Sequence, residues 1–463
     1  MIPTDDTIAA IATATGAAGL AVVRVSGPRA LALADAVLGG SACVSAAASH
    51  TLHHGWAVWP GTERRLDEVV VAVFRAPRSY TREDVVELSC HGGALPARRV
   101  LAALLHAGAR LATPGEFTLR AFLHGRLDLA QAEAVADLIH AETERARELA
   151  LAQLAGALSR RLASIEERVT DAVAEVEARV DFAEDVGGIE VPEHVVAAIG
   201  SVAAEIAALL ESASYARAVR EGVRLPIVGR PNAGKSSLFN ALLGEERAIV
   251  SAEPGTTRDR VSEAIEVAGV RVSLSDTAGL RDTSDAIERL GVERSRAAIE
   301  QAPLVLWVVD ASAALTEEDR AIAERLQGRR VLIALNKCDL PRGIGMGEVE
   351  ELLDGGLLRS IPVSAVRGDG LDTLHEALAA ALGAGSGKAG AGGVAVGNQR
   401  HAEALARART ALDRGAAAAR AGAPGEIVAL ELRESLAAIG EVTGRAVGED
   451  LLDRIFSRFC VGK

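Results

Sequence analysis

The pattern of apolar and polar residues changes along the chain and predicts several kinds of region. Residues 1–125 carry short apolar runs rich in β-branched residues, which are typical of strands, between stretches that favour helices. The expected strands cover residues 8–12, 19–25, 69–74 and 84–88, and the expected helices cover residues 28–38 and 94–106. This mixture predicts an N-terminal α/β domain.

Helical patterning follows in residues 126–221 and returns in residues 398–463. Apolar residues of the first helical region recur at the i, i+3, i+4, i+7 spacing of one helix face, at Leu129, Ala132, Val135, Ala136 and Ile139. Residues 222–383 alternate expected strands with helices, which favours a mostly parallel sheet. Residues 384–397 are rich in glycine and alanine and are expected to form a flexible linker. We therefore expect a helical domain into which an α/β module is inserted.

One segment of the inserted module carries a strong chemical signature. Residues 229–236 read Gly-Arg-Pro-Asn-Ala-Gly-Lys-Ser and fit G-x-x-x-x-G-K-[ST], the loop that surrounds nucleotide phosphates. The loop lies between an expected strand at 223–228 and an expected helix at 237–243, whose N-terminus adds positive charge. Lys235 is expected to reach the β- and γ-phosphates, and the Ser236 hydroxyl is expected to bind magnesium.

Two further motifs are expected to surround the terminal phosphate. Residues 276–279 read Asp-Thr-Ala-Gly and follow an expected strand. The Asp276 carboxylate can hold magnesium through water, and the backbone N–H of Gly279 can approach the γ-phosphate. Residues 255–259 read Gly-Thr-Thr-Arg-Asp, and the Thr257 hydroxyl is expected on the same magnesium.

Two more motifs predict recognition of guanine. Residues 336–339 read Asn-Lys-Cys-Asp and follow an expected strand at 331–335. The Asp339 carboxylate can accept hydrogen bonds from N1–H and the 2-amino group of guanine, which adenine lacks, and such a site rejects the unpaired analogue by about 10⁴-fold. Residues 364–366, Ser-Ala-Val, follow an expected strand at 361–363 and are expected to close over the base.

Together the motifs predict that the inserted module binds GTP. The residues expected to contact GTP are Asn232, Ala233, Gly234, Lys235, Ser236, Ser237, Ser251, Ala252, Glu253, Pro254, Gly255, Thr256, Thr257, Asp276, Thr277, Ala278, Gly279, Asn336, Lys337, Cys338, Asp339, Ser364, Ala365 and Val366.

The residue that would orient the attacking water is not evident from the motifs. Leu280 follows the Asp-Thr-Ala-Gly motif, where Ras-type enzymes carry a glutamine, and leucine can neither orient nor deprotonate water. Glu288 is the nearest plausible carboxylate, although the sequence by itself favours a solvated helix charge at this position. Arg258 and Arg281 lie in switch-like loops, but their spacing does not identify an arginine finger.

Composition sets limits on the class of protein. The chain has 463 residues, a length that suggests two or three domains, and 49% of its residues are hydrophobic. Its formal net charge of −13 argues against a generally basic nucleic-acid binder, although a local basic patch remains open. The four cysteines show no C-x-x-C pair, which argues against structural zinc. No leader and no apolar run of about 18 residues is evident, so we expect a cytoplasmic protein without membrane contact.

Distinctive motifs occur in every part of the chain. In the inserted module these are Asn232 in the phosphate loop, residues 255–259, and Leu280 after the Asp-Thr-Ala-Gly motif. Outside that module they are residues 24–27, 79–87, 91–93, 114–122, 127–134 and the C-terminal Phe-Cys-Val-Gly-Lys of residues 459–463. Together these motifs resemble those of the MnmE (TrmE) family of tRNA-modification GTPases. The motifs of the two termini are the more specific ones, because many GTPases share the nucleotide motifs.

The resemblance implies a function that the residue pattern does not show. Family members act with an FAD-containing MnmG-type partner to modify carbon 5 of the wobble uridine in certain tRNAs, which leaves an aminomethyl or carboxymethylaminomethyl group. A tetrahydrofolate derivative (5-formyl or 5,10-methylene) is implied as the one-carbon source. Its implied contacts are Arg24, Glu87, Arg126 and Lys463, with arginine at 126 where the family typically has lysine. Cys460 resembles a family cysteine that tRNA modification requires.

The resemblance also implies how hydrolysis proceeds without a glutamine. In potassium-dependent GTPases of this kind, a fixed cation near the β- and γ-phosphates neutralises developing charge as an arginine finger would. The implied potassium ligands are Asn232, Ser251, Glu253 and Thr256. The family further implies a homodimer, and a heterotetramer with the FAD-containing partner.

Two other functions are compatible with the nucleotide motifs. A ribosome-assembly GTPase of the Era or Der type shares the phosphate loop and the hydrophobic switch residue, but it usually carries a basic RNA-binding appendage or a second nucleotide domain. Only one G-x-x-x-x-G-K-S motif occurs here, and residues 398–463 have a helical pattern. A non-catalytic dimeric GTP switch is the second alternative, for which hydrolysis would be dispensable.

Overall fold

The structure is a computed structural model in which the chain forms two compact units. It describes residues 5–14, 16–39, 43–181, 190–244, 248–249, 264–276, 300, 302–384, 394–445 and 447–463. The first unit consists of Met1–Ala136, Leu154–Ala163 and Leu436–Lys463, and the second of Asp137–Gln153 and Ser164–Ser435. The N- and C-terminal segments therefore belong to one unit, although they lie at opposite ends of the sequence.

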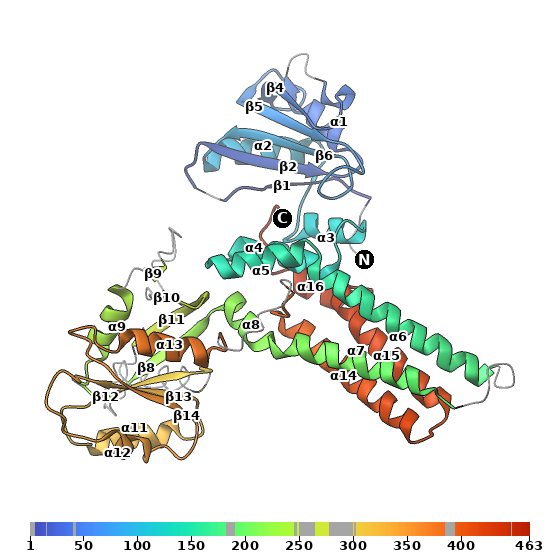
Figure 1. Ribbon diagram of the computed structural model, residues 1–463. Helices are drawn as coiled ribbons and strands as arrows, with labels where there is room; N and C mark the ends of the chain where they lie inside the picture. Colours follow the sequence, from blue (N-terminus) through green and yellow to red (C-terminus); the bar gives the residue numbers. More distant parts are fainter. Residues whose placement is uncertain are drawn as a thin grey trace. The chain divides into compact units, whose positions relative to one another are not determined.

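The first unit contains a seven-stranded sheet (Figure 1). Its strands, in spatial order, are β3 (Leu38–Gly39), β4 (Thr51–Val58), β5 (Arg65–Phe74), β6 (Val85–His91), β2 (Leu20–Ser26), β1 (Ile8–Ile11) and β7 (Arg110–Leu111). Apolar side chains of alternate positions pack against helices α1 (Ala30–Ala36) and α2 (Ala94–Ala107) in one buried cluster. The opposite face of the sheet carries the remaining positions, including Arg24 and Glu87.

The C-terminal residues complete the first unit by packing on its helices. Phe456, at the end of α16 (Glu449–Phe456), and Phe459 join one apolar cluster with side chains of α3 (Glu116–Leu123) and of α4 (Leu129–His140). Gly115 has φ +71° and lies so close to this segment that a Cβ would meet the Phe456 carbonyl oxygen at 2.5 Å. This packing fixes the C-terminal segment against the N-terminal part of the chain.

The second unit contains the inserted module, whose sheet is mostly parallel as the sequence predicts. Its strands, in spatial order, are β14 (Leu357–Pro362), β13 (Val331–Asn336), β12 (Val305–Asp310), β8 (Val223–Val228), β11 (Val270–Asp276), β10 (Ala264–Val267) and β9 (Ala248–Ile249). Among the described strands of this sheet, β10 runs opposite in direction to the other six.

Helices cover both faces of this sheet, because neighbouring strand residues point to opposite faces. Helices α9 (Lys235–Gly244) and α13 (Leu371–Ala381) pack in one apolar cluster with alternate residues of β8, β12 and β13. Helices α11 (Glu317–Leu326) and α12 (Met346–Glu350) pack on the other face in a second cluster. This is the layered arrangement of an α/β nucleotide-binding fold.

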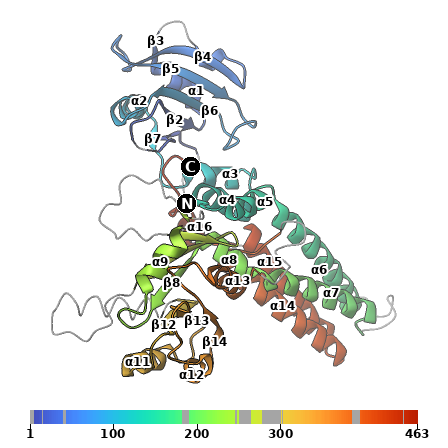
Figure 2. The same ribbon diagram turned by 60° about the vertical axis from the view of Figure 1, so that its left-hand side comes forward.

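Helices form the rest of the second unit, and the ends of three of them (Leu154, residues 157–163 and residues 436–443) belong to the first unit. They are α5 (Glu144–Leu154), α6 (Ala157–Asp181), α7 (Glu193–Glu211), α8 (Ala213–Glu221), α14 (Gln399–Arg420) and α15 (Gly425–Thr443). Helix α7 lies alongside α14 (Figure 1 and Figure 2), and its Val196, Ile199 and Ile206 are buried. Residues Glu193–Glu221 are long and apolar enough to cross a membrane by length and composition, a property shared by core helices of soluble proteins.

The turn between β10 and β11 is bound to these helices by three polar contacts. The Thr143 hydroxyl donates to the Gly269 carbonyl at 2.8 Å, and the Tyr215 hydroxyl donates to the Ala268 carbonyl at 2.8 Å. The Arg271 guanidinium lies 2.7 Å from a carboxylate oxygen of Glu142. The hairpin of the inserted sheet is therefore anchored to the helical part of the same unit.

Most expected elements are present, with shifts at their ends. The strand expected at residues 361–363 begins earlier, at Leu357, and the helix expected at 237–243 already begins at Lys235. The sequence pattern did not predict strand β4, in which His53, His54 and Gly55 interrupt the apolar run. The domain boundaries and the linker remain predictions, and residues 385–393 of that linker lie outside the described residues.

Candidate nucleotide site and N-terminal pocket

The phosphate loop joins strand β8 to helix α9, as its motif predicts. Gly234 has φ +90°, and a Cβ at this position would lie 2.1 Å from Nδ2 of Asn336, so only glycine fits there. Asn232 also has a left-handed backbone, with φ +61°. The Lys235 ammonium donates to the carbonyl oxygens of Gly229 and Arg230, at 2.9 Å each, and therefore lies against the loop.

Asn336 connects three of the predicted motifs. Its Nδ2 donates to the Ala233 carbonyl of the phosphate loop at 2.9 Å, and its Oδ1 accepts from the Ala365 N–H at 3.1 Å. The Ser364 hydroxyl donates to Oδ1 of Asp339 at 2.7 Å. The structure thus brings together the phosphate loop and both expected base-contacting segments around one side chain.

The Asp339 carboxylate is prepared to act as a hydrogen-bond acceptor. The hydrogen bond from Ser364 lowers the pKa of Asp339 below its ordinary value, so the side chain stays ionised at neutral pH. An ionised carboxylate accepts hydrogen bonds on both oxygens, and guanine offers two neighbouring donors. The geometry therefore suits the base contact that the motif predicts.

Asp310 is a residue of this site that sequence reasoning missed. It ends strand β12, and its Oδ2 lies 2.6 Å from the Lys337 ammonium and 3.7 Å from the Arg230 guanidinium. Its Oδ1 accepts from the N–H and hydroxyl of Ser312, at 3.0 and 2.6 Å. Burial would raise the pKa of Asp310, but the hydrogen bonds from Lys337 and Ser312 outweigh it and lower the pKa.

Several predicted site residues lie outside the part of the chain that the structure describes. These are Ser251, Ala252, Glu253, Pro254, Gly255, Thr256, Thr257, Thr277, Ala278, Gly279 and Glu288. The backbone of Asp276 is described, and it ends β11 beside Ile227 of β8. Because the carboxyl ends of parallel strands lie at the same edge of a sheet, Asp276 lies at the edge where the phosphate loop begins.

The first unit brings together residues that the family resemblance links to folate. Arg24 and Glu87 face each other across β2 and β6, and their side chains form an ion pair at 2.7 Å. Arg24 also donates to the Gly462 carbonyl at 3.3 Å, which places the C-terminal Lys463 one residue from this pair. The Arg24 guanidinium lies 5.3 Å from the centre of the Tyr80 ring, within the range of a cation–π contact.

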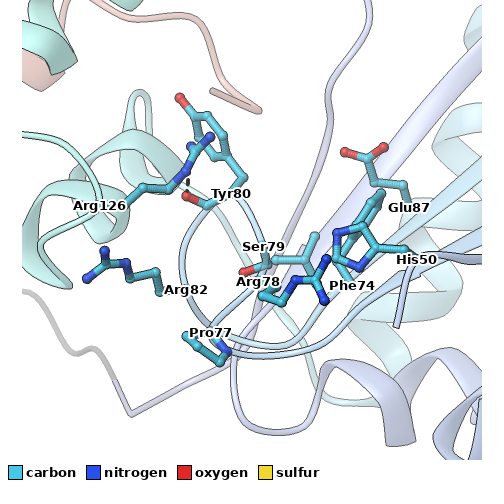
Figure 3. Close-up of a pocket in the computed structure, with 10 residues that line it drawn as sticks. His50, Phe74, Pro77, Arg78, Ser79, Tyr80, Arg82, Glu87 and Arg126 are labelled. Atoms are coloured by element: carbon cyan, nitrogen blue, oxygen red, sulfur yellow. Dashed lines mark hydrogen bonds between the residues drawn. The ribbon is translucent and has the colours of Figure 1, made fainter. Parts of the chain in front are cut away.

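A cavity of about 490 Å³ opens beside this ion pair. Figure 3 shows the residues that line it, which are His50, Phe74, Pro77, Arg78, Ser79, Tyr80, Arg82, Val85, Glu87 and Arg126. The Arg126 guanidinium lies 4.7 Å from the centre of the Tyr80 ring and donates to the Tyr80 carbonyl at 3.1 Å. Glu87 and Arg126 therefore line one cavity, with Arg24 and the chain end next to it, and the volume suits a small organic ligand.

The other expected functional side chain of this unit is that of Cys460. Cys460 is exposed and its thiol is free, and its backbone carbonyl accepts a hydrogen bond from the Gly115 N–H at 3.4 Å. Among the described residues, no group of three or more His, Cys, Asp or Glu side chains could hold a metal ion.

The fold of the second unit and its motifs define a P-loop GTPase. A mostly parallel sheet carries the phosphate loop at the end of β8 and the Asn-Lys-Cys-Asp motif at the end of β13, and Asn336 connects the two. The nucleotide-binding module thus shows that the protein is a GTPase, and the other domains distinguish its family from other GTPases.

Comparison with known proteins identifies that family. Residues 129–460 match the MnmE helical domain, and residues 7–126 match the N-terminus of the GTP-binding protein TrmE. The tRNA modification GTPase MnmE of Symbiobacterium thermophilum is 47% identical over 462 residues, which covers 99% of this chain and 100% of that protein. The MnmE of Alkaliphilus oremlandii is 43% identical over 461 residues, with 99% of each chain covered. The chain belongs to the MnmE (TrmE) family.

The inserted module also has counterparts among solved structures. The G domain of the T. maritima FeoB iron transporter has 27% sequence identity and a TM-score of 0.27, and the match covers 34% of this chain and 98% of that domain. This overall similarity is too low to support a conclusion.

Proposed function

We propose that this protein hydrolyses GTP to drive modification of the wobble uridine in certain tRNAs, together with an FAD-containing partner. The observation that carries the proposal is the full-length similarity to proteins named tRNA modification GTPase, at 47% identity over 462 residues. The similarity spans both the nucleotide module and the N-terminal domain that holds the cavity. The proposed product carries an aminomethyl or carboxymethylaminomethyl group on carbon 5 of the uridine.

The N-terminal cavity supports a tetrahydrofolate derivative as the one-carbon source. Folate has a flat, hydrogen-bonding ring system and an anionic tail. The ion pair of Arg24 and Glu87, beside the ring of Tyr80, offers donors, acceptors and an aromatic face. Arg126 lines the same cavity, and Lys463 follows directly after Gly462, which contacts Arg24. When bound, the folate would supply the carbon, and these residues would hold and orient it.

We further propose that a bound cation replaces the missing glutamine in hydrolysis. Ser236, in the first turn of α9, would bind magnesium together with Thr257. The left-handed Asn232 would bind potassium with Ser251, Glu253 and Thr256, and hydrolysis would require two copies of the chain. Hydrolysis is expected to rise strongly when potassium replaces sodium, and equal rates in both salts would contradict the potassium site.

Glu288 is the proposed residue that orients the attacking water. Glu288→Ala is expected to reduce kcat strongly while GTP affinity stays close to that of the wild type, because the carboxylate acts on water rather than on the nucleotide. Asp339→Asn serves as the contrasting variant, since it should weaken GTP binding and favour xanthine nucleotides instead. An unchanged kcat for Glu288→Ala would remove this residue from the mechanism.

Reconstitution tests the proposed function as a whole. The protein, the FAD-containing partner, 5,10-methylenetetrahydrofolate, GTP and unmodified tRNA are incubated, and the nucleosides are analysed by mass spectrometry. Wobble uridine modified at carbon 5 should form with wild-type protein and fail to form with Glu288→Ala. Full modification with the hydrolysis-deficient variant would favour a non-catalytic GTP switch.

A further inference from the structure

The N-terminal cavity carries more positive charge than the contacts proposed above account for. Its charged lining residues are Arg78, Arg82, Arg126 and Glu87, with His50 beside them. The single carboxylate among them, Glu87, is already paired with Arg24. Within the described part of the chain, no carboxylate forms an ion pair with Arg78, Arg82 or Arg126. The cavity is therefore suited to an anion.

The positive groups are distributed around the cavity rather than gathered at one point. Residues 77–82 form a loop along its wall, and Figure 3 shows Arg78 on the side of His50 and Glu87, with Arg82 and Arg126 on the other side. Arg82 donates to the His124 carbonyl at 2.9 Å, a neutral partner that leaves its charge uncompensated. Separated guanidinium groups match a ligand with several carboxylates better than a compact anion with one charge.

We propose that the cavity selects a folate that carries a chain of γ-linked glutamates, and that Arg78 and Arg82 bind the carboxylates of this chain. The inference rests on the proposed folate function and extends it to the form of the ligand. Arg24, Glu87 and Tyr80 hold the ring system at one end. Each further glutamate adds a carboxylate, and the exposed arginines of the loop are positioned to pair with it.

The test compares folates that differ only in the length of this tail. Binding of 5-formyltetrahydrofolate with one or three glutamates is measured by isothermal titration calorimetry on the full chain. Wild-type protein is expected to bind the triglutamate about three- to tenfold more tightly, because exposed ion pairs contribute modestly. Higher salt should reduce this preference, since the pairs are screened.

Variants assign the preference to the two arginines. The double variant Arg78→Ala with Arg82→Ala is expected to bind both folates with equal affinity, because the carboxylates that the triglutamate adds lose their partners. It should still bind the monoglutamate measurably, since Arg24, Glu87 and Tyr80 hold the ring system. Arg98→Ala removes an exposed arginine from α2, which does not line the cavity, and should keep the full preference. Measurable monoglutamate binding by the double variant would show that its cavity is intact.

The possible failures are distinguishable. Equal binding of both folates by wild type, or a preference that persists in the double variant, would overturn the inference and leave the folate site standing. Loss of tRNA binding in the double variant without change in folate preference would assign the arginines to RNA phosphate and overturn it too. Failure of wild type to bind either folate would overturn the proposed folate function, and this inference with it.

Discussion

Replacement of Asp310 by asparagine tests whether the nucleotide site depends on the carboxylate that pairs with Lys337 of the base-recognition motif. The substituted amide would keep the size of the side chain and an oxygen for the N–H and hydroxyl of Ser312. It would lose the charge that lies 2.6 Å from the Lys337 ammonium. Lys337 belongs to the base-recognition motif and has a left-handed backbone, with φ +65°. The ion pair with Asp310 holds its side chain in place.

The size of the effect follows from the burial of this pair. A hydrogen bond to a charged group contributes roughly 1.5–3 kcal/mol. The side chain of Asp310 is 9% exposed, but that of Lys337 is 31% exposed, so solvent screening reduces the value to about 1–2 kcal/mol. This corresponds to a factor of roughly 5–30 in an equilibrium constant.

The assay is titration of the full chain with a fluorescent GDP analogue at pH 7, together with urea unfolding. Asp310→Asn is expected to weaken nucleotide binding by up to that factor and to leave the protein folded. Because the pKa of Asp310 is lowered, its contribution is complete above the ordinary value of 3.8 and is lost only as the pH falls through the folded value. Asp354→Asn makes the same chemical change at an exposed position and should have no effect.

A folded Asp310→Asn protein with wild-type affinity would refute this reasoning. It would show that Lys337 keeps its position without the carboxylate. A loss of affinity in the Asp354→Asn control would instead point to a general charge effect.

Three other substitutions test separate parts of the structure. Gly234→Ala places a Cβ 2.1 Å from Nδ2 of Asn336 at φ +90°, so nucleotide affinity should fall by roughly 5- to 100-fold for about 1–3 kcal/mol of strain, measured by the same titration. Tyr215→Phe removes the hydrogen bond to the Ala268 carbonyl and should lower the free energy of unfolding by about 0.5–1 kcal/mol in urea, whereas an unchanged value would show that the contact is not stabilising. Glu116→Gln breaks a buried ion-pair network and should lower the free energy of unfolding in urea by about 3–5 kcal/mol. Burial would raise the pKa of Glu116, but hydrogen bonds, the largest of them from Arg110, lower it below its ordinary value of 4.5. The difference in unfolding free energy between the variant and the wild type should therefore be complete above pH 4.5. It should shrink as the pH falls through the pKa of Glu116 in the folded protein. A difference that grows toward acid pH would contradict this assignment.

The local elements of the nucleotide module were predictable because their signals lie within short segments. The strand expected at residues 223–228 is β8, and the motifs after β8 and β13 occur where the pattern indicates. Strand β4 was not predictable in the same way. Its Leu52 is 73% exposed and its His53 and His54 are polar, so the run lacks the apolar signal of a buried strand.

The sequence alone determined what a few residues at fixed spacing define. These features are the phosphate loop and the guanine-recognition motif, and the motifs also indicated the family. Only the tertiary structure decided which side chains that are distant in the sequence contact each other. Asp310 meets Lys337 only because β12 and β13 run parallel with Asp310 beside Asn336. Arg24 meets Gly462, 438 residues away, only because the C-terminal segment packs on the N-terminal unit. Periodicity reports which face of an element is buried, whereas strand order and register decide which charges become neighbours.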